Sequence, residues 1–232
     1  MGKNLLSIDW DYFIPIKRKW CGSYIENRRN NINIWYKRYF EDMKNGENVE
    51  KSVRTGRELI GFWNRIKRYF IIKKEMKMYV SDSHKISYYI AKDNKCDKVI
   101  NFDAHSDLGY GGLKSLNFEL NCGNWLGKLL KNKIVQKVSI IYSPYTYESK
   151  KEFKEINEKF HVSYHETEDF KDKIAVDYIH ICRSGSWTPP WLDAEFYGFI
   201  KSLNRPYKIF KCPKREWDPK GLTLSDKIYI TL

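Results

Sequence analysis

The chain has 232 residues, enough for one α/β domain with a large buried core, and we expect residues 1–232 to form a single domain. The chain has five cysteines without paired zinc-type spacing, which argues against a disulfide framework and predicts a reduced, cytoplasmic protein. It shows neither a signal-peptide pattern nor a long apolar run, so we expect no membrane span. The net charge of +13 is distributed unevenly along the chain, which matters for its partners.

The first predicted strand, residues 4–9, leads directly into the sequence Asp9-Trp10-Asp11. Alternate side chains of an extended segment point the same way, so the carboxylates of Asp9 and Asp11 project from one side. An Asp-x-Asp pair after a strand is also common in turns and helix caps. The pair therefore indicates a metal site only in combination with other ligands.

A basic insertion follows at residues 17–75. Residues 17–74 hold 16 Lys or Arg and 6 Asp or Glu, a local charge of +10. Aromatic and aliphatic residues recur there at helical spacing, which predicts two amphipathic helices with basic outer faces. The aromatic side chains either belong to the core or, with the basic face, form a wall that attracts an acidic partner such as a leader peptide. The insertion is also a candidate dimer surface, whereas no nucleic-acid-binding motif accompanies it.

Two further predicted strands, 77–81 and 97–102, also end in residues that bind metals. His84 follows the first, and the second is followed by Asp103, His105 and Asp107, spaced i, i+2, i+4. Parallel strands of an open α/β sheet present their carboxyl ends at one edge, so we expect all these ligands in one pocket. Four carboxylates balance the charge of two divalent ions, and their combination with two imidazoles suits Mn²⁺, with Zn²⁺ or Fe²⁺ as alternatives.

Strands and helices alternate along the rest of the chain, which predicts a three-layer αβα fold with a mainly parallel sheet. We expect further strands near residues 136–142, 160–164, 175–182 and 206–210, with a possible last one at 227–231. We expect helices near residues 84–93, 123–132, 148–159 and 189–204. Thr188 is the predicted N-cap of the last helix, because two prolines follow it.

Two asparagines after the central ligand motif are candidate substrate contacts. Asn121 and Asn124 stand where the helix at 123–132 begins, so their side chains either face the pocket or cap the helix.

The segment 183–195 is the second source of substrate contacts. It combines small residues with Trp187 and Trp191, which suits a groove for an extended chain. Asp193 and Glu195 either bind a guanidinium, whose planar group favours a bidentate carboxylate, or are ordinary surface charges.

Residues 103–107, Asp-Ala-His-Ser-Asp, resemble the Asp-Ala-His-x-Asp signature of the arginase and agmatinase (ureohydrolase) superfamily. Residues 7–15, Ser-Ile-Asp-Trp-Asp-Tyr-Phe-Ile-Pro, resemble its Ser-x-Asp-x-Asp-x-x-Asp-Pro signature, with Ile14 in place of the last Asp. His84 stands where the family has its Gly-Gly-Asp-His segment, without the glycines. The order is permuted, because the Asp-x-Asp segment normally follows the central motif. With the later Trp-Thr-Pro-Pro-Trp segment, this arrangement resembles a divergent branch that includes peptide arginases of ribosomal peptide biosynthesis.

The resemblance implies an arginase-like fold and a pair of manganese ions. One ion would be held by His84, Asp103, Asp107 and Asp9, and the other by His105, Asp103, Asp9 and Asp11, so that Asp103 and Asp9 bridge. It further implies hydrolysis of arginine side chains in a peptide to ornithine and urea, with Asp107 as the catalytic residue that carries a proton to the leaving amine. Without Asp9 and Asp11, the remaining ligands would support a single ion.

Three functional interpretations remain open from the sequence. The first is the peptide arginase, whose partner is an arginine-containing peptide. The second is a small-molecule ureohydrolase or a metal-dependent deacetylase, because loops and not metals select the substrate. The third is a non-enzymatic binding protein that uses the basic insertion.

Overall fold

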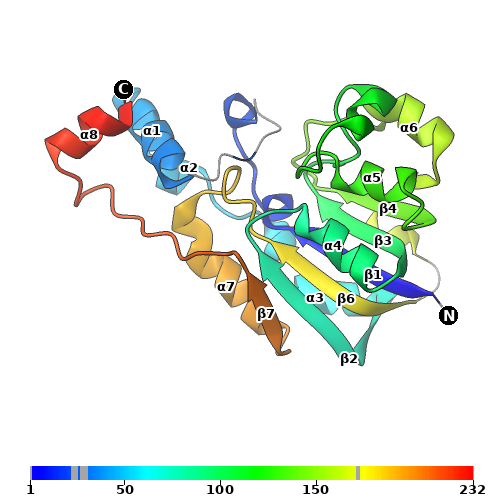
Figure 1. The fold of residues 1–232 in the computed structure, drawn as a ribbon. Coiled ribbons are helices and arrows are strands. Elements are labelled where there is room, and N and C mark those ends of the chain that lie inside the picture. The colour runs from blue at the N-terminus through cyan, green and yellow to red at the C-terminus, as the bar shows by residue number, and fades with distance from the viewer. Residues whose placement is uncertain (1, 22–25, 27–30, 171–172, 232) are drawn as a thin grey trace.

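The computed structural model describes residues 2–21, 26, 31–170 and 173–231. In these residues seven strands form one sheet in the order β5-β4-β3-β1-β6-β2-β7, and every neighbouring pair is parallel (Figure 1). The strands are β1 (Lys3–Asp9), β2 (Phe70–Ser81), β3 (Cys96–Asp103), β4 (Lys137–Tyr142), β5 (Val162–Tyr164), β6 (Ile174–Cys182) and β7 (Tyr207–Phe210). The predicted α/β class is confirmed, and the likeness to an arginase sheet stays a prediction.

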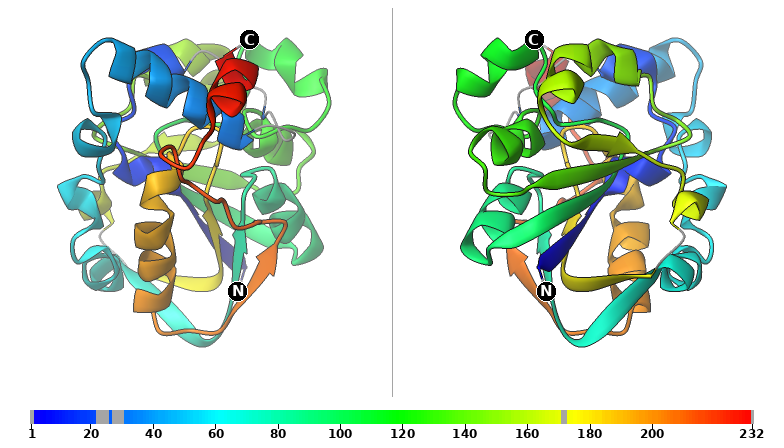
Figure 2. Two further views of the ribbon diagram at one scale, coloured as in Figure 1. Left: turned by 90° about the vertical axis from the view of Figure 1, so that its left-hand side faces the viewer. Right: turned by 90° about the vertical axis from the view of Figure 1, so that its right-hand side faces the viewer.

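Helices cover both faces of the sheet (Figures 1 and 2). They are α1 (Asn31–Lys44), α2 (Val49–Ser52), α3 (Phe62–Tyr69), α4 (Ile86–Asp93), α5 (Trp125–Lys131), α6 (Lys154–Lys159), α7 (Asp193–Ser202) and α8 (Leu224–Thr231). Successive side chains of β1 point to opposite faces of the sheet, so they enter two separate cores. Leu6 and Ile8 pack with α3 and α7, while Leu5 packs with α4 and α5. The result is three layers with an apolar core on each side of the sheet.

The basic insertion supplies α1, α2 and α3 between β1 and β2, and residues 22–25 and 27–30 of it lie outside the described residues. The predicted helical periodicity is confirmed, because Trp35, Phe62 and Trp63 are all buried. They join the core on the α7 side of the sheet. The aromatic residues of α1 and α3 are therefore packing groups, and residues 70–75 already belong to β2.

Two local predictions were wrong. Residues 227–231 lie in helix α8, because Thr223 and Asp226 cap each other's backbone amides and start a helix at Leu224. Thr188 does not cap α7, which begins at Asp193 after a 3-10 turn at Pro190–Leu192. Its hydroxyl instead donates to the carbonyl oxygens of the loop that follows β6.

The carboxyl ends of the strands all point to one end of the molecule, where α1 and α8 lie side by side (Figure 2). The loops that leave β1, β2, β3 and β6 therefore meet there. None of the helices in the described part of the chain is both long enough and apolar enough to cross a membrane.

Candidate metal centre

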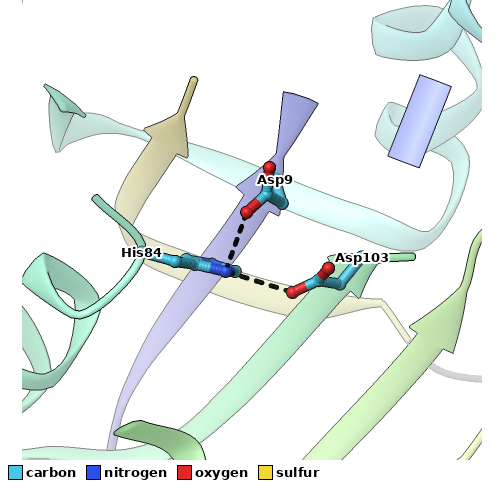
Figure 3. Close-up of side chains that lie close together, drawn as sticks. All are labelled: Asp9, His84 and Asp103. Atoms are coloured by element: carbon cyan, nitrogen blue, oxygen red, sulfur yellow. Dashed lines mark ion pairs between the residues drawn. The ribbon is translucent and has the colours of Figure 1, made fainter. Parts of the chain in front are cut away.

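Two groups of carboxylates and imidazoles lie at the carboxyl ends of β1 and β3. One comprises Asp9, His84 and Asp103 (Figure 3), and the other comprises Asp11, Asp103 and His105. In each group the ligand atoms lie within 4.8 Å of one another. Residues some 90 positions apart in the chain thus share one site because β1 and β3 are adjacent parallel strands.

The first group surrounds the ring of His84. Its Nδ1 lies 3.1 Å from Asp9 Oδ2, 3.1 Å from Asp103 Oδ2 and 2.9 Å from Asp107 Oδ2. His84 is buried, with 1% of its side chain exposed, and packs against the ring of Trp125. Three carboxylates converge on one nitrogen atom.

The second group surrounds His105, which is partly exposed. Its Nδ1 lies 2.9 Å from Asp11 Oδ2 and 3.6 Å from Asp103 Oδ1. Asp103 therefore directs one oxygen to each imidazole, and it is common to both groups. This position is the one expected for a carboxylate that bridges two ions.

Backbone and side-chain donors orient the carboxylates. Asn101 Nδ2 donates to Asp103 Oδ2 at 3.0 Å, and the Ala104 amide donates to Asp11 Oδ1 at 3.2 Å. Ser184 Oγ donates to Asp9 Oδ2 at 2.5 Å. Since each acidic side chain retains further oxygen lone pairs, these contacts hold the carboxylates without using up their capacity to bind a cation.

Asp107 is held by the helix that follows it. Trp125 Nε1, in the first turn of α5, donates to Asp107 Oδ2 at 2.5 Å. The backbone of Asp107 has a φ of 53°, in the left-handed region that non-glycine residues rarely adopt. The local strain is tolerated where the fold overdetermines the position, which is typical of functional sites.

The carboxylates repel one another strongly. Burial, and then the charge of Asp103, raises the pKa of Asp107 to about 7. Burial and the charges of Asp9 and Asp103 likewise raise the pKa of Asp11 well above its ordinary value. Burial opposes ionisation of Asp103 too, but the two histidines outweigh it and hold its pKa well below the usual range. Without a compensating cation the site retains protons.

The residues present fit a divalent cation. Although three carboxylate oxygens surround it, the buried Nδ1 of His84 makes no hydrogen bond of acceptable geometry to any residue that the structure describes. A nitrogen lone pair and several carboxylate oxygens that face a common point are the donor set of Mn²⁺, Fe²⁺ or Zn²⁺. Buried carboxylates are also stable only when paired with cationic groups or a metal.

Five of the six metal-type residues line a cavity of about 330 Å³. Asp9, Asp11, His84, His105 and Asp107 all contribute to its lining. The loop after β4 and the start of the basic insertion also line the cavity, with residues that include Arg18, Tyr147 and Glu148. The cavity is large enough to admit the end of a long side chain.

Glu148, which the sequence analysis missed, is an acidic residue on this cavity outside the two ligand groups. Its Oε2 accepts a hydrogen bond from the Ser106 amide at 2.8 Å, and its Oε1 accepts one from Tyr110 Oη. Burial raises its pKa. Because Glu148 follows β4 in a loop without a recognisable motif, only its contact with the Ser106 amide and its place in the cavity lining identify it.

The predicted substrate-binding residues are placed unevenly. Trp187 lines the cavity. Asn121 Oδ1 accepts from the Gly123 amide and Asn124 Oδ1 accepts from the Asn121 amide, so both side chains stabilise their own loop. Trp191 donates from Nε1 to the Val53 carbonyl oxygen at 3.0 Å.

The two predicted guanidinium-binding carboxylates are already paired within the chain. Asp193 contacts Arg183 and Arg215, and Glu195 accepts hydrogen bonds from Arg54 and Thr55. Neither is among the described residues that line the cavity. The structure thus brings all six predicted metal ligands together but leaves five of the six predicted substrate contacts away from the cavity.

Comparison with known proteins adds no relative to this picture. No protein-family model, no curated protein and no solved structure matches the chain.

Proposed function

We propose that the protein is a dinuclear metal-dependent hydrolase that converts arginine side chains, in a peptide, to ornithine with release of urea. The single observation that carries the proposal is the pair of Asp/His groups that share Asp103 and whose other members all line one cavity. The spacing of residues 103–107 and 7–15, which resembles the ureohydrolase signatures, adds the class of reaction. The preferred metal is manganese, with zinc or iron as alternatives.

The two groups define which residues would hold the ions. Asp9, His84, Asp103 and Asp107 surround one position, and Asp11, Asp103 and His105 surround the other, with Asp9 as a second candidate bridge. A bound pair of divalent ions polarises the substrate and lowers the pKa of a water molecule towards neutrality.

Asp107 is the candidate proton carrier. It lines the cavity next to the other metal-type residues, where a carboxylate can accept a proton from a water molecule activated by bound metal. Trp125 Nε1 fixes one of its oxygens, so the carboxylate keeps one orientation. In the proposed reaction Asp107 accepts a proton from the attacking water and transfers it to the departing ornithine amine.

Glu148 is the candidate partner for the substrate cation. Its carboxylate lies on the cavity wall, and the structure gives it hydroxyl and amide donors but no ion pair among the described residues. A guanidinium favours a carboxylate of this kind because it supplies parallel donors. The basic insertion, in this proposal, attracts an acidic leader segment of the same peptide and not the arginine itself.

Metal analysis and mass spectrometry test the proposal together. The purified chain should bind two Mn²⁺, and an arginine-containing peptide incubated with it should lose CH₂N₂, the difference between arginine and ornithine, while urea appears. One zinc per chain with release of acetate from an acetyl-lysine peptide would favour the deacetylase alternative. A chain that binds no metal at micromolar concentration would refute both hydrolase functions.

A further inference from the structure

A row of buried polar side chains lies directly behind His84, on the side of the ring away from the carboxylates. His84 Nε2 lies 2.7 Å from Ser7 Oγ, which lies 2.8 Å from Ser87 Oγ. Ser87 Oγ lies 2.6 Å from His180 Nδ1, and His180 Nε2 lies 2.8 Å from Ser81 Oγ. We call Ser7, Ser87, His180 and Ser81 the serine–histidine relay; they come from β1, α4, β6 and β2 and are all fully buried.

The hydrogen atoms of the relay can be assigned from its far end. Ser81 Oγ lies 2.9 Å from the Ser83 carbonyl oxygen, which can only accept, so the Ser81 hydroxyl donates there. His180 Nε2 must then donate to Ser81. Both ring nitrogens of His180 contact hydroxyl groups, and a neutral ring has one donor and one acceptor, so its Nδ1 accepts from Ser87.

The same reasoning continues to the metal centre. The Ser87 hydrogen is committed to His180, so Ser87 Oγ accepts from Ser7, and Ser7 Oγ in turn accepts from His84 Nε2. If the hydrogen bonds ran in the opposite direction, the Ser81 hydroxyl would donate to His180 Nε2. No hydrogen would then lie between Ser81 Oγ and the Ser83 carbonyl oxygen, although the two atoms are in contact. The relay therefore places a hydrogen on Nε2 of His84 and leaves Nδ1 to face Asp9, Asp103 and Asp107.

We propose that the serine–histidine relay is a positioning device that fixes the tautomer and ring orientation of His84, so that its Nδ1 is the nitrogen that binds the metal. This inference depends on the metal centre of the proposed function. Four buried polar side chains within an apolar core are unfavourable unless all are hydrogen-bonded, and here each one is. Packing alone would be satisfied by apolar residues of similar size.

The first test measures Mn²⁺ affinity of the Ser7→Ala variant by electron paramagnetic resonance. Loss of the hydroxyl removes the acceptor of His84 Nε2, and we expect the dissociation constant to rise about 10- to 100-fold, as for other lost supports of metal-binding histidines. Ser139→Ala is the matched control, because Ser139 is a buried serine of β4 that contacts Ser163 and not the metal centre. Its affinity should stay at the wild-type value.

The second test separates the relay from mere packing. His180→Leu fills the space but ends the relay, whereas His180→Gln supplies one donor and one acceptor on a flat group. We expect the leucine variant to lose Mn²⁺ affinity and the glutamine variant to recover part of it. Nitrogen-15 NMR of the zinc-loaded protein should show His84 protonated at Nε2 in the wild type and a mixture of states in the leucine variant.

Each outcome can be assigned. Wild-type protein that binds no Mn²⁺ or Zn²⁺ would refute the metal centre itself. Wild-type protein that binds metal, together with unchanged affinity and an unchanged His84 tautomer in Ser7→Ala and His180→Leu, would refute the relay alone. If either variant fails to fold, as judged by circular dichroism, Ser87→Ala breaks the middle of the relay and is measured in the same way.

Discussion

At the scale of single residues, Asp103 belongs to both ligand groups because its two oxygens face different imidazoles. Oδ2 faces His84 and accepts from Asn101, while Oδ1 faces His105 and accepts its amide hydrogen. A residue in this position at the end of β3 connects the two halves of the site. Its replacement should therefore affect both metal positions at once.

Asp103→Asn keeps the size of the side chain and removes its charge. We expect both Mn²⁺ ions to be lost, with affinity lowered about 100-fold or more, because even the loss of an outer support lowers affinity by up to about that factor. Equilibrium dialysis with elemental analysis measures the stoichiometry. Asp177→Asn is the control, since Asp177 accepts from Asn4 and pairs with Lys73 away from the cavity. Two ions retained by Asp103→Asn would contradict the shared-ligand assignment.

Glu148→Gln tests the proposed contact to the substrate cation. Loss of a charge-assisted hydrogen bond of about 1.5–3 kcal/mol corresponds to a rise in KM for an arginine peptide of about 10- to 100-fold. Metal content should not change. Glu152→Gln is the control, because Glu152 also lines the cavity but caps the Ser149 amide. Equal KM values for the two variants would exclude Glu148 as the cation partner.

Strand-end spacing was enough to predict the six metal-type residues. Asp9, Asp11 and the 103–107 motif each follow an apolar strand, and parallel topology brings such ends together. Glu148 and His180 could not be found this way. The side chain of Glu148 is placed by a loop, and the role of His180 depends on its register opposite Ser7, which no local pattern specifies.

At the scale of elements, the loop from β6 to α7 is held by a buried ionic network. Arg183 is fully buried; its Nε donates to Asp82 at 2.7 Å and its Nη2 donates to the Pro213 carbonyl oxygen at 2.8 Å. The next residue, Ser184, has a left-handed backbone with φ of 50° and bonds to Asp9. The network thus supports the loop that orients a metal-type residue.

Arg183→Met leaves Asp82 without its buried cation, whereas Asp193 keeps its pairing with Arg215. Breaking a buried pair in this way destabilises a protein by about 3–5 kcal/mol, and we expect a loss of that size in urea unfolding. Arg54→Met provides the comparison, because the Arg54–Glu195 pair is exposed and such pairs contribute about 1 kcal/mol or less. Similar losses in both variants would show that the loop does not depend on Arg183.

Element boundaries were predicted well where apolar runs are short and uninterrupted. All seven strands have counterparts in the prediction, but β2 begins at Phe70, well before the predicted residue 77. Lys73, Lys74 and Glu75 obscure its first half, where the register with β6 is also interrupted. Residues 227–231 are rich in strand-forming side chains, yet they are helical because the Thr223 hydroxyl caps the Asp226 amide and starts a helix.

At the scale of the whole molecule, proton and metal binding are coupled to folding. Asp11 and Asp107 have raised pKa values because burial and neighbouring carboxylates oppose their ionisation. A metal requires the ionised forms. Below about pH 7 a proton on Asp107 therefore competes with metal, and this competition weakens as the pH rises.

We expect Mn²⁺ to raise the melting temperature by about 10 °C at pH 8 when its concentration is about 1,000 times the dissociation constant. The sign follows from the raised pKa of Asp107: as pH falls through about 7 the folded chain takes up protons that metal must displace, so the increase should shrink towards zero near pH 5.5. Scanning calorimetry with and without Mn²⁺ measures both values. An increase that grows on acidification would contradict this coupling.

Arg215 lies far along the chain from the Asp-x-Asp segment and the 103–107 motif, but it binds the loop between β6 and α7. Its guanidinium donates to the carbonyl oxygens of Gly185 and Thr188, at 2.9 Å and 2.7 Å, and to Asp193. During synthesis on the ribosome, the early Asp-x-Asp segment emerges long before this clamp exists. The loop that orients Asp9 can therefore reach its final form only after residue 215 has left the exit tunnel.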